Sequence, residues 1–562
     1  MSEAGDRVSS SGAAQAQQTW QAPAVLVARV DRYLAAAATV GSPAVMHTLR
    51  ADLGDASSVE WRDVGRQFLQ RGQPLFAAAV LELALQRYPA ISELRYWLGY
   101  AQWQAGQVDR AEAELRRVLA GEMHAGASQL LAQLLRGQGR FKAAAACMAA
   151  VARVPSDDIG GVLGGIQFVR ECHQQSLAAE LCAEHLSRGM SDPRLHALAG
   201  QIEQELGHFE QARACYVGAL AQGINLNEWF VLGSLASLQR YVDRQHADFA
   251  MFGARLQDRT LAPRARASIL FALGKACDDI GAYADAANAW RQANQLMRNL
   301  HSWPRPAWKD FVQARVTAVA PPLRGRHADC VPIFVVGLPR TGTTLMAELL
   351  GRHPGVCNRG ELPTLEYLAA QLMSLPAREQ AAHVSEAAEI YLTHLRRDDA
   401  PLGHYIDKNP LNFRYLDYVT AMFPQARVIH CRRHARDTAL SIWSQPFARD
   451  EYAFARDFGD IAALAEGCDV LMAHWRRSLP MPIITVDYEQ LVADPAAMLA
   501  GLWPRLGLVP DDLPSIVHAD QPAPITSASL WQARQPVHKR SVARWRHYGD
   551  LLPELVQLFA DE

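Results

Sequence analysis

A short turn between Gly337 and Thr344 carries the residues whose types and spacing point most directly to chemistry; its sequence is Gly-Leu-Pro-Arg-Thr-Gly-Thr-Thr. An apolar run over 333–336 precedes it, and an apolar helical pattern over 345–350 follows it. A strand, a glycine turn and a helix start in this order gather unpaired backbone N–H groups around one point, where an anion is stabilised. The pattern predicts a phosphate-binding turn, and an ordinary surface turn before a helix is the alternative.

One position separates this turn from the loop of nucleotide-hydrolysing enzymes. The spacing of Gly337 and Gly342 nearly matches the pattern G-x-x-x-x-G-K-[ST], but Thr343 stands where such an enzyme needs a lysine for the outer phosphates. The charge lies inside the turn instead, as Arg340, and no strand-borne aspartate for magnesium is evident after it. We expect a loop that holds phosphate without metal-assisted phosphoryl transfer. A P-loop NTPase or small-molecule kinase remains the second enzymatic interpretation.

The turn resembles the 5′-phosphosulfate-binding loop of the sulfotransferases, whose pattern is G-x-P-R-[ST]-G-T-T. The resemblance covers about 331–550 and is closest to tyrosylprotein sulfotransferases and to bacterial sulfotransferases with helical repeats in front. It implies a P-loop-like α/β domain with a central parallel sheet over 331–562. It also implies 3′-phosphoadenosine 5′-phosphosulfate (PAPS) as donor co-substrate, with no metal. The residues assigned to the 5′-phosphosulfate are Gly337, Pro339, Arg340, Thr341, Gly342, Thr343 and Thr344, with Arg340 also taking part in catalysis.

Two residues further along have types suited to sulfuryl transfer. Glu361 lies in a loop bounded by glycine and proline, and a carboxylate there can take the proton of an acceptor hydroxyl. The family has its catalytic glutamate in a similar Gly-Glu context; the alternative is a capping or surface carboxylate. Lys408, in Asp-Lys-Asn-Pro, resembles the Lys-x-Pro segment of the family, where a lysine stabilises the departing oxygen. Without that context Lys408 would be an ordinary solvated charge.

A second buried strand is predicted over 427–431, and several arginines follow it. In sulfotransferases an arginine and a serine eight residues later hold the 3′-phosphate of the donor, and Arg433 and Ser441 have that spacing. Arg432 shifts the spacing by one, so Arg433 is the better match. A basic helix start at the surface is the alternative. A third strand, predicted over 482–486, leads into a Y-E-x-L segment that we expect to support the sheet.

A late basic stretch ends beside Trp545. The family closes a loop with a serine and a basic residue over the donor nucleotide at this point, and such a lid would keep water from the donor. Arg544 departs from the lysine that is usual just before the tryptophan. A disordered basic tail is the alternative. The candidate donor contacts are Ser529, Lys539, Arg540 and Arg544.

The first half of the chain repeats itself on a fixed step. Glycines recur at intervals of 34, 33 and 68 residues, His173 stands at the skipped position, and a small residue follows each of them by five. The pattern resembles the tetratricopeptide repeat, in which helix pairs stack to bury their apolar faces. It predicts an all-α domain over 21–300, with six to seven helix pairs between about 58 and 300, and the phase is lost over 222–260. The glycines are Gly72, Gly106, Gly139 and Gly207, and the small residues are Ala77, Ala111, Ala144, Ala178 and Ala212.

The ends of this repeat domain have distinct compositions. Residues 1–20 are rich in Ser, Ala, Gly and Gln, and we expect them to be disordered. Residues 301–330 are Pro-rich and basic, which predicts a linker to the catalytic domain. The concave face of stacked repeats suits a peptide or protein partner. A spacer or an arm that forms a homodimer is an equal alternative.

The 562 residues have a formal net charge of −2, so no global field favours nucleic acid or an anionic membrane, and we expect neither as partner. The apolar patch over 24–40 is broken by charged residues, which predicts an amphipathic helix and no membrane span. The nine cysteines are scattered with no C-x-x-C pair, and no secretory signal is visible, so a cytoplasmic location is expected.

The sequence therefore predicts PAPS-dependent transfer of a sulfuryl group to an acceptor hydroxyl. Resemblance and a peptide-sized groove suggest a protein or peptide tyrosine as acceptor. However, the segment Leu-Pro-Thr-Leu-Glu after Glu361 lacks the basic residues that animal tyrosylprotein sulfotransferases use there to hold acidic peptides. A saccharide, lipid or small-metabolite hydroxyl stays open. The non-enzymatic alternative is a repeat scaffold whose second domain only binds nucleotide or protein.

Overall fold

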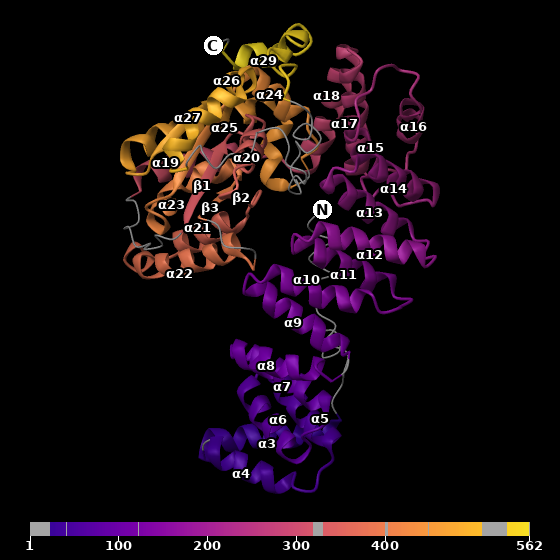
Figure 1. The fold of residues 1–562 in the computed structure, drawn as a ribbon, viewed down its shortest axis with the longest axis vertical. Helices are drawn as coiled ribbons and strands as arrows, with labels where there is room; N and C mark the ends of the chain where they lie inside the picture. The colour runs from indigo at the N-terminus through magenta and orange to yellow at the C-terminus, as the bar shows by residue number, and fades with distance from the viewer. Residues whose placement is uncertain are drawn as a thin grey trace. The chain divides into compact units, whose positions relative to one another are not determined.

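The computed structural model describes residues 23–560 except 41, 122, 319–329, 399–402, 448 and 509–536 (Figure 1). The chain divides into two compact units, Met1–Leu181 and Cys182–Glu562. The predicted domain boundary at residue 300 thus lies inside the second unit. The predicted disorder over 1–20 concerns residues outside the described part of the chain.

Helices fill the first 300 residues, as the repeat pattern predicts. Helix α3 (Ala24–Val40) and helix α4 (Ser42–Asp52) come first, and within the described residues seven helix pairs follow. No described helix is both long and apolar enough to cross a membrane. The pairs are α5 (Ser58–Gln70) with α6 (Pro74–Arg87), α7 (Ser92–Gln104) with α8 (Val108–Leu119), α9 (Ala125–Gly137) with α10 (Phe141–Ala152), α11 (Ile159–Glu171) with α12 (Gln175–Ser187), α13 (Pro193–Leu206) with α14 (Phe209–Ala221), α15 (Val231–Ser237) with α16 (Ala247–Leu256), and α17 (Pro263–Asp279) with α18 (Tyr283–Leu300).

The periodic glycines lie in the turns within the pairs, where the backbone has positive φ. The φ angles of Gly72, Gly106, Gly139 and Gly207 are 67°, 74°, 74° and 87°. His173, at the skipped position, adopts φ 58° and makes the same turn without a glycine. A left-handed residue after a helix ends it and lets the next helix turn back, which favours glycine. The small residues five positions later are all fully buried between helices. The predicted period is confirmed.

A five-stranded parallel sheet forms the centre of the rest of the second unit. Its strand order is β2-β3-β1-β4-β5, so the chain leaves β1 on one side and returns on the other. Open sheets of this kind bind ligands where the order reverses, beyond the carboxyl ends of the strands. The strands at 333–336, 427–431 and 482–486 were predicted; β2 and β3 were not. The strands are β1 (Val331–Gly337), β2 (Val356–Asn358), β3 (His404–Asp407), β4 (Arg427–Arg432) and β5 (Ile483–Asp487).

Helices cover both faces of the sheet because its strands are apolar on both sides. Phe334 and Val336 face one core cluster, and Ile333 and Val335 face the other. Helices α20, α26 and α27 cover the second face, while most other helices pack on the first. The elements are α20 (Thr343–Leu350), α21 (Thr364–Ser374), α22 (Ala377–Arg396), η1 (Pro410–Tyr415), α23 (Leu416–Met422), α24 (Ala435–Trp443), η2 (Asp450–Arg456), α25 (Phe458–Ser478), α26 (Tyr488–Ala493), α27 (Pro495–Leu506), η4 (Arg544–His547) and α29 (Pro553–Leu558).

The predicted linker over 301–330 is wrong for its described part, which ends at 318. Residues Arg305–Thr317 form helix α19, whose prolines stand at the helix start, where a missing N–H costs nothing. The indole of Trp308 donates to the Ala463 carbonyl of α25 at 2.9 Å, and Arg315 forms a buried ion pair with Asp417. This segment is therefore part of the core rather than a tether.

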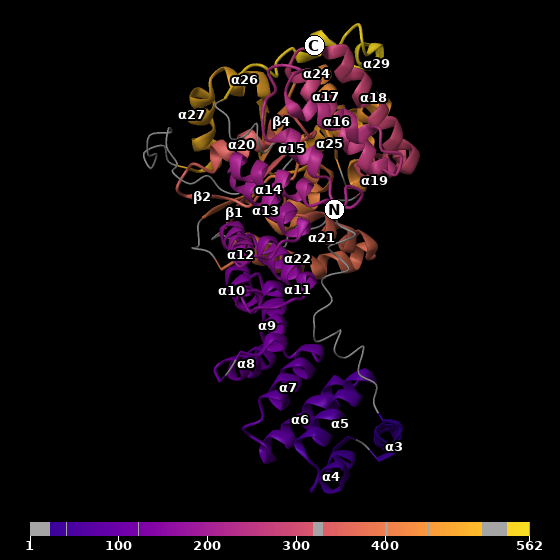
Figure 2. The same cartoon turned by 90° about the vertical axis from the view of Figure 1, so that its right-hand side faces the viewer.

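The last helix pair also packs into the sheet-bearing part of the second unit. Trp290 of α18 lies against Trp443 of α24, with ring centroids 6.3 Å apart. The Asn294 side chain donates to the Trp443 carbonyl at 2.9 Å. Both views show α17 and α18 beside α24 and α29 (Figure 2). A single hydrophobic cluster runs from α17 to α29. The separate repeat domain over 21–300 is therefore corrected: its last pair belongs to the same core as the sheet.

Candidate active site

The turn after β1 has a backbone that only glycine fits at two positions. Gly337 has φ 143°, and an added Cβ would lie 2.4 Å from the Cys431 carbonyl oxygen on the neighbouring strand β4. Gly342 has φ 91°, and its added Cβ would lie 2.6 Å from the ring of Tyr488. Arg340 itself has φ 71°, which is rare for a residue with a side chain. The turn is thus held tightly between β4 and the start of α26.

The polar residues of the turn face inward. The Thr341 hydroxyl donates to the Leu338 carbonyl at 2.7 Å and closes the turn. Pro339 is buried together with Thr341, Thr343 and Thr344. Since α20 begins at Thr343, its unpaired N–H groups and the dipole of the helix favour an anion at this place.

The structure brings Arg340 together with the two residues predicted for the 3′-phosphate. Arg340 Nε donates to Ser441 Oγ at 3.1 Å, and Arg433 Nη1 donates to the Arg340 carbonyl at 3.1 Å. Burial, together with the charges of Arg433 and Arg544, lowers the pKa of Arg340 to about 10. Like charges held this close are stabilised when an anion binds among them.

The surroundings of Arg433 suit a guanidinium that donates hydrogen bonds to an anion. Burial lowers its pKa, and its guanidinium lies over the Tyr488 ring, 4.8 Å from the centroid. A second N–H group donates to the Ser541 carbonyl. The buried Nε has no hydrogen-bond partner among the described residues. A buried donor without a partner is costly, so this atom fits a bound phosphate oxygen. Tyr488 and Ser541 were not predicted as site residues.

Arg544 reaches this cluster from the C-terminal segment. Asp437 of α24 accepts hydrogen bonds from the backbone N–H groups of Ala543 and Trp545, at 2.6 and 2.8 Å. This carboxylate anchors the turn that carries Arg544. The Arg544 guanidinium then forms an ion pair with Asp278, at 2.9 Å.

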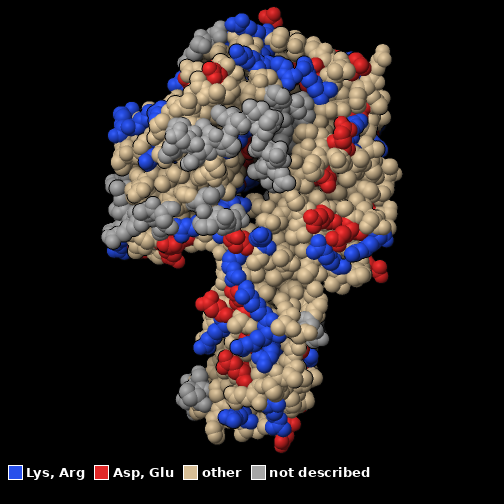
Figure 3. Space-filling model, viewed as in Figure 1, with Lys and Arg blue, Asp and Glu red and all other residues tan. Residues whose placement is uncertain are grey.

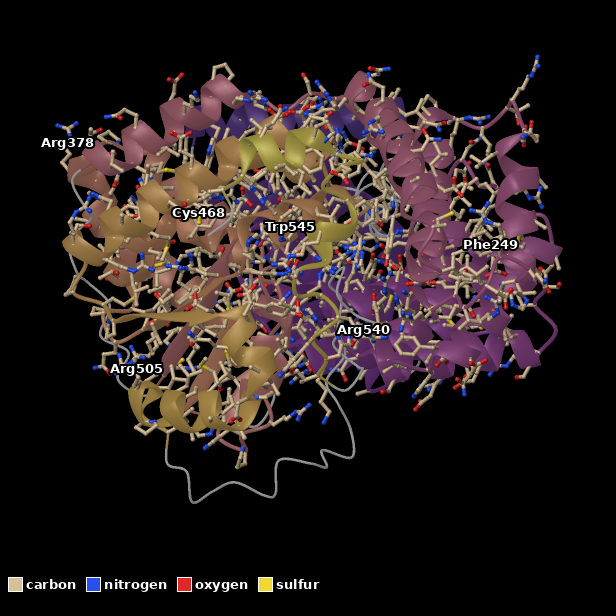
Figure 4. The ribbon with its side chains drawn as sticks, turned by 90° about the horizontal axis from the view of Figure 1, so that it is seen from above. Phe249, Arg378, Cys468, Arg505, Arg540 and Trp545 are labelled. Carbon is tan, nitrogen blue, oxygen red and sulfur yellow. The ribbon has the colours of Figure 1, made fainter. Side chains whose placement is uncertain are left out.

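The remaining residues of the predicted lid lie differently. Lys539 and Arg540 are exposed, and in the described part of the chain their side chains make no hydrogen bond or ion pair. Arg540 and Trp545 are both labelled in Figure 4. Among the described residues neither side chain forms a hydrogen bond to the arginine cluster, and Ser529 lies outside the described residues.

Glu361 and Lys408 form an ion pair at the carboxyl end of β3. Two backbone hydrogen bonds bring them together: Arg359 N–H to the Ile406 carbonyl at 2.9 Å, and Lys408 N–H to the Gly360 carbonyl at 2.8 Å. The Lys408 side chain is 4% exposed and that of Glu361 is 28% exposed. Because β3 pairs with β1 in parallel, the Glu361–Lys408 pair and the turn after β1 lie at the same end of the sheet, where the strands have their carboxyl ends.

Comparison with known proteins agrees with this geometry. Residues 332–512 match the model of the sulfotransferase family, and residues 68–124 match a model of the tetratricopeptide repeat. The chain carries a sulfotransferase-family domain preceded by tetratricopeptide repeats.

Relatives with curated sequences match only in part. An uncharacterized protein of Aquifex aeolicus (strain VF5) is 28% identical over 327 residues, which cover 54% of this chain and 43% of that protein. A protein-tyrosine sulfotransferase of Drosophila melanogaster is 23% identical over 249 residues, which cover 41% of this chain and 49% of that protein. The chain thus spans less than half the length of either relative. The solved structure of the sulfotransferase STF1 from Mycobacterium tuberculosis H37Rv is 17% identical, covering 56% of this chain and 98% of that one, with a TM-score of 0.24.

A buried carboxylate, Asp407, holds the segments of Glu361 and Lys408 in place. Asp407 is fully buried and accepts from Tyr391 Oη at 2.5 Å and from Asn412 Nδ2 at 2.8 Å. It also accepts from the backbone N–H groups of Leu362, at 3.3 Å, and Asn409, at 3.1 Å, which are the residues just after Glu361 and Lys408. Burial raises the pKa of Asp407 to about 7, against the lowering effect of these hydrogen bonds.

Charges near Glu361 are paired one to one. Arg414 of η1 forms an ion pair with Glu366 at 3.1 Å, and Arg449 forms one with Glu451 at 3.0 Å. Burial raises the pKa of Glu451, and the neighbouring Glu366 and Glu361 add to this effect. Arg414 and Arg449 were not predicted, because neither stands in a motif.

More widely, basic and acidic side chains are interspersed on the face in Figure 3. The described residues contain no group of three or more His, Cys, Asp or Glu that could hold a metal ion.

Proposed function

We propose that the protein is a PAPS-dependent sulfotransferase that transfers a sulfuryl group to an acceptor hydroxyl. One observation carries the proposal: three groups of residues lie at the carboxyl end of one parallel sheet. They are the turn with Arg340, the two residues that contact Arg340 (Arg433 and Ser441), and the ion pair of Glu361 with Lys408. The family of the domain supports the transferase class.

The donor would be held by two anion subsites. The backbone N–H groups of the turn, with Arg340, Thr343 and Thr344, suit the 5′-phosphosulfate, and Arg433 with Ser441 suits the 3′-phosphate. The hydrogen bond between Arg340 and Ser441 joins these subsites, so the donor would lie along the edge of the sheet. The Nε of Arg433, which has no partner among the described residues, offers the 3′-phosphate a hydrogen-bond donor.

Transfer would then depend on the buried pair beside this site. Glu361 accepts the proton of the acceptor hydroxyl while its oxygen forms a bond to sulfur. Lys408 stabilises the negative charge that develops on the bridging oxygen as the bond between that oxygen and sulfur breaks. In the structure the side chains of Lys408 and Glu361 form an ion pair, so both groups lie at one point of the site. The sulfuryl group carries less charge than a phosphoryl group, so we expect no metal requirement.

The ion pairs near Glu361 indicate which kind of acceptor the site suits. Because Glu366 and Glu451 neutralise Arg414 and Arg449, the described residues around Glu361 show no excess of positive charge that would hold an acidic peptide. The pairs favour a hydroxyl in neutral surroundings. A tyrosine in a polypeptide without flanking acids fits, in line with the name of the Drosophila relative, and a saccharide or small-metabolite hydroxyl fits equally.

Calorimetry with 3′,5′-adenosine bisphosphate and with ATP plus magnesium tests the proposal. We expect the bisphosphate to bind and ATP to bind weakly or not at all. Magnesium-dependent binding and turnover of ATP would favour the NTPase or kinase interpretation, and binding of neither would favour a repeat scaffold. Transfer of labelled sulfate from PAPS in a lysate lacking the protein, followed by mass spectrometry, would identify the acceptor.

A further inference from the structure

The C-terminal segment meets the proposed donor site at its backbone. The Ser541 carbonyl accepts from Arg433, and Asp437 of α24 binds the N–H groups on both sides of Arg544. Trp545 stacks on His434, with centroids 5.8 Å apart and planes 5° apart. These contacts fix residues 541–545 against the start of α24, the helix that also carries Ser441.

The side chain of Arg544, in contrast, is held by the last helix pair of the repeats. Its Nη2 lies 2.9 Å from Asp278 Oδ2 of α17, and its guanidinium lies 5.6 Å from the centroid of Trp290 of α18. Asp278 also accepts from Tyr548 Oη at 2.5 Å. The side chains of Arg544 and Asp278 are only 22% and 18% exposed, so water screens their pair weakly.

This arrangement places a repeat-borne acid next to a cluster of arginines. Arg544 adds a positive charge beside Arg340 and Arg433, and burial together with this charge lowers the pKa of both. Asp278 offsets that charge and fixes the direction of the Arg544 guanidinium. Removing Asp278 would take away the anchor of the Arg544 guanidinium, which could then turn away from the cluster.

We propose that Asp278 is a positioning residue of the donor site, so that the last repeat pair, α17 with α18, completes the binding of the donor nucleotide. The inference rests on the proposed function. It assigns the last repeat pair a role in binding the donor, in addition to the recruitment of a substrate or partner proposed for the repeats. Because coupling between sites is reciprocal, a change that shifts α17 and α18 against α24 changes donor affinity, and donor binding strengthens the docking of the pair.

The full-length variant Asp278→Asn tests this inference, measured as affinity for 3′,5′-adenosine bisphosphate and as KM for donor and acceptor. We expect about 10-fold weaker bisphosphate binding and a matching rise in donor KM, with acceptor KM unchanged. Asp278→Glu, which keeps the charge, should recover most of the affinity. The matched control is Asp285→Asn, because Asp285 stands on α18 in an exposed pair with Arg244 and should not alter binding.

A double-mutant cycle separates positioning from general structural damage. Arg544→Gln should weaken bisphosphate binding as much as Asp278→Asn, and the double variant should lose little more than either. If Asp278→Asn does not yield folded protein, Arg544→Gln tests the same contact from the other side. Wild-type affinity in a folded Asp278→Asn or Arg544→Gln variant would overturn this inference alone. Failure of the wild-type protein to bind the bisphosphate would instead overturn the proposed function.

Discussion

The proposed site has two sides that differ in charge: a donor side around Arg340 and Arg433, and a transfer side around Glu361 and Lys408. On the donor side, Arg340, Arg433 and Arg544 converge from separate segments, and the charges of Arg433 and Arg544 lower the pKa of Arg340. On the transfer side, each cation has its own carboxylate, as in Lys408 with Glu361 and Arg414 with Glu366. Excess positive charge suits the binding of an anion, whereas a balanced pair suits the movement of one proton.

This contrast has a kinetic meaning. Loss of a donor-side group should weaken binding of the nucleotide, and loss of a transfer-side group should slow the chemical step. A variant on one side that produced the effect expected of the other would show that the division is wrong.

The largest effect is expected on the transfer side. Glu361→Ala should lower kcat by about 10²–10⁴-fold, because the acceptor hydroxyl loses its base, while binding of the bisphosphate persists. The measurement is labelled sulfate transfer together with calorimetry. Glu379→Ala, at the exposed start of α22, is the matched control and should keep wild-type turnover. Unchanged turnover in Glu361→Ala would remove this residue from the role of base.

A smaller effect is expected on the donor side. Arg433→Ala should weaken bisphosphate binding by about 10- to 100-fold, because a charged hydrogen-bond donor is lost. Donor KM should rise more than kcat falls. The neighbouring Arg432 is exposed and pairs with Asp487 at 3.4 Å, so Arg432→Ala serves as control and should bind normally. Equal losses in both variants would mean that the site responds to general charge rather than to Arg433.

The smallest effect is expected for Asp407, the buried carboxylate that holds the segments of Glu361 and Lys408. With its pKa raised to about 7 from an ordinary 3.8, Asp407 binds a proton in the folded state that the unfolded chain has released. Its contribution to stability is thus complete below about pH 4 and is lost as the pH rises toward 7, by at most about 1.4 kcal/mol per pH unit. Asp407→Asn cannot ionise. Its deficit in melting temperature relative to wild type should therefore narrow between pH 5 and 7.

Exposed carboxylates provide the comparison for this pH series. Asp285→Asn should show a constant difference in melting temperature from wild type over the same range, since this side chain is exposed. A deficit of Asp407→Asn that stayed constant with pH would show that Asp407 is ionised in the folded protein at all of these values.

Sequence patterns predicted what depends on local spacing. The glycine period marks turns with positive φ because each repeat needs the same left-handed residue, and His173 fills one such turn in place of glycine. The apolar runs of β1, β4 and β5 were visible because these strands are buried on both faces. The approach of Arg340 to Arg433 and Ser441 was expected from the resemblance to the sulfotransferases, and it agrees with the rule that parallel strands gather their carboxyl ends.

What the sequence did not reveal depends on contacts between distant segments. Strand β2 has three residues and β3 has four, too few to show a period. The linker was predicted from prolines that in fact begin helix α19, since proline suits both a tether and the first turn of a helix. Asp278 lies 266 residues from Arg544, and nothing in its local sequence distinguishes it from other helix carboxylates.

The packing of Trp290 and Asn294 on Trp443 limits how this architecture can be recombined. Grafting foreign repeats at residue 300 would strip the cover from an aromatic surface of the transferase and leave Arg544 without its acid. A graft in the loop before Pro263 would carry α17 and α18 along with the fold they complete. Any exchange of the repeats therefore has to leave α17 and α18 with the sheet-bearing part of the chain.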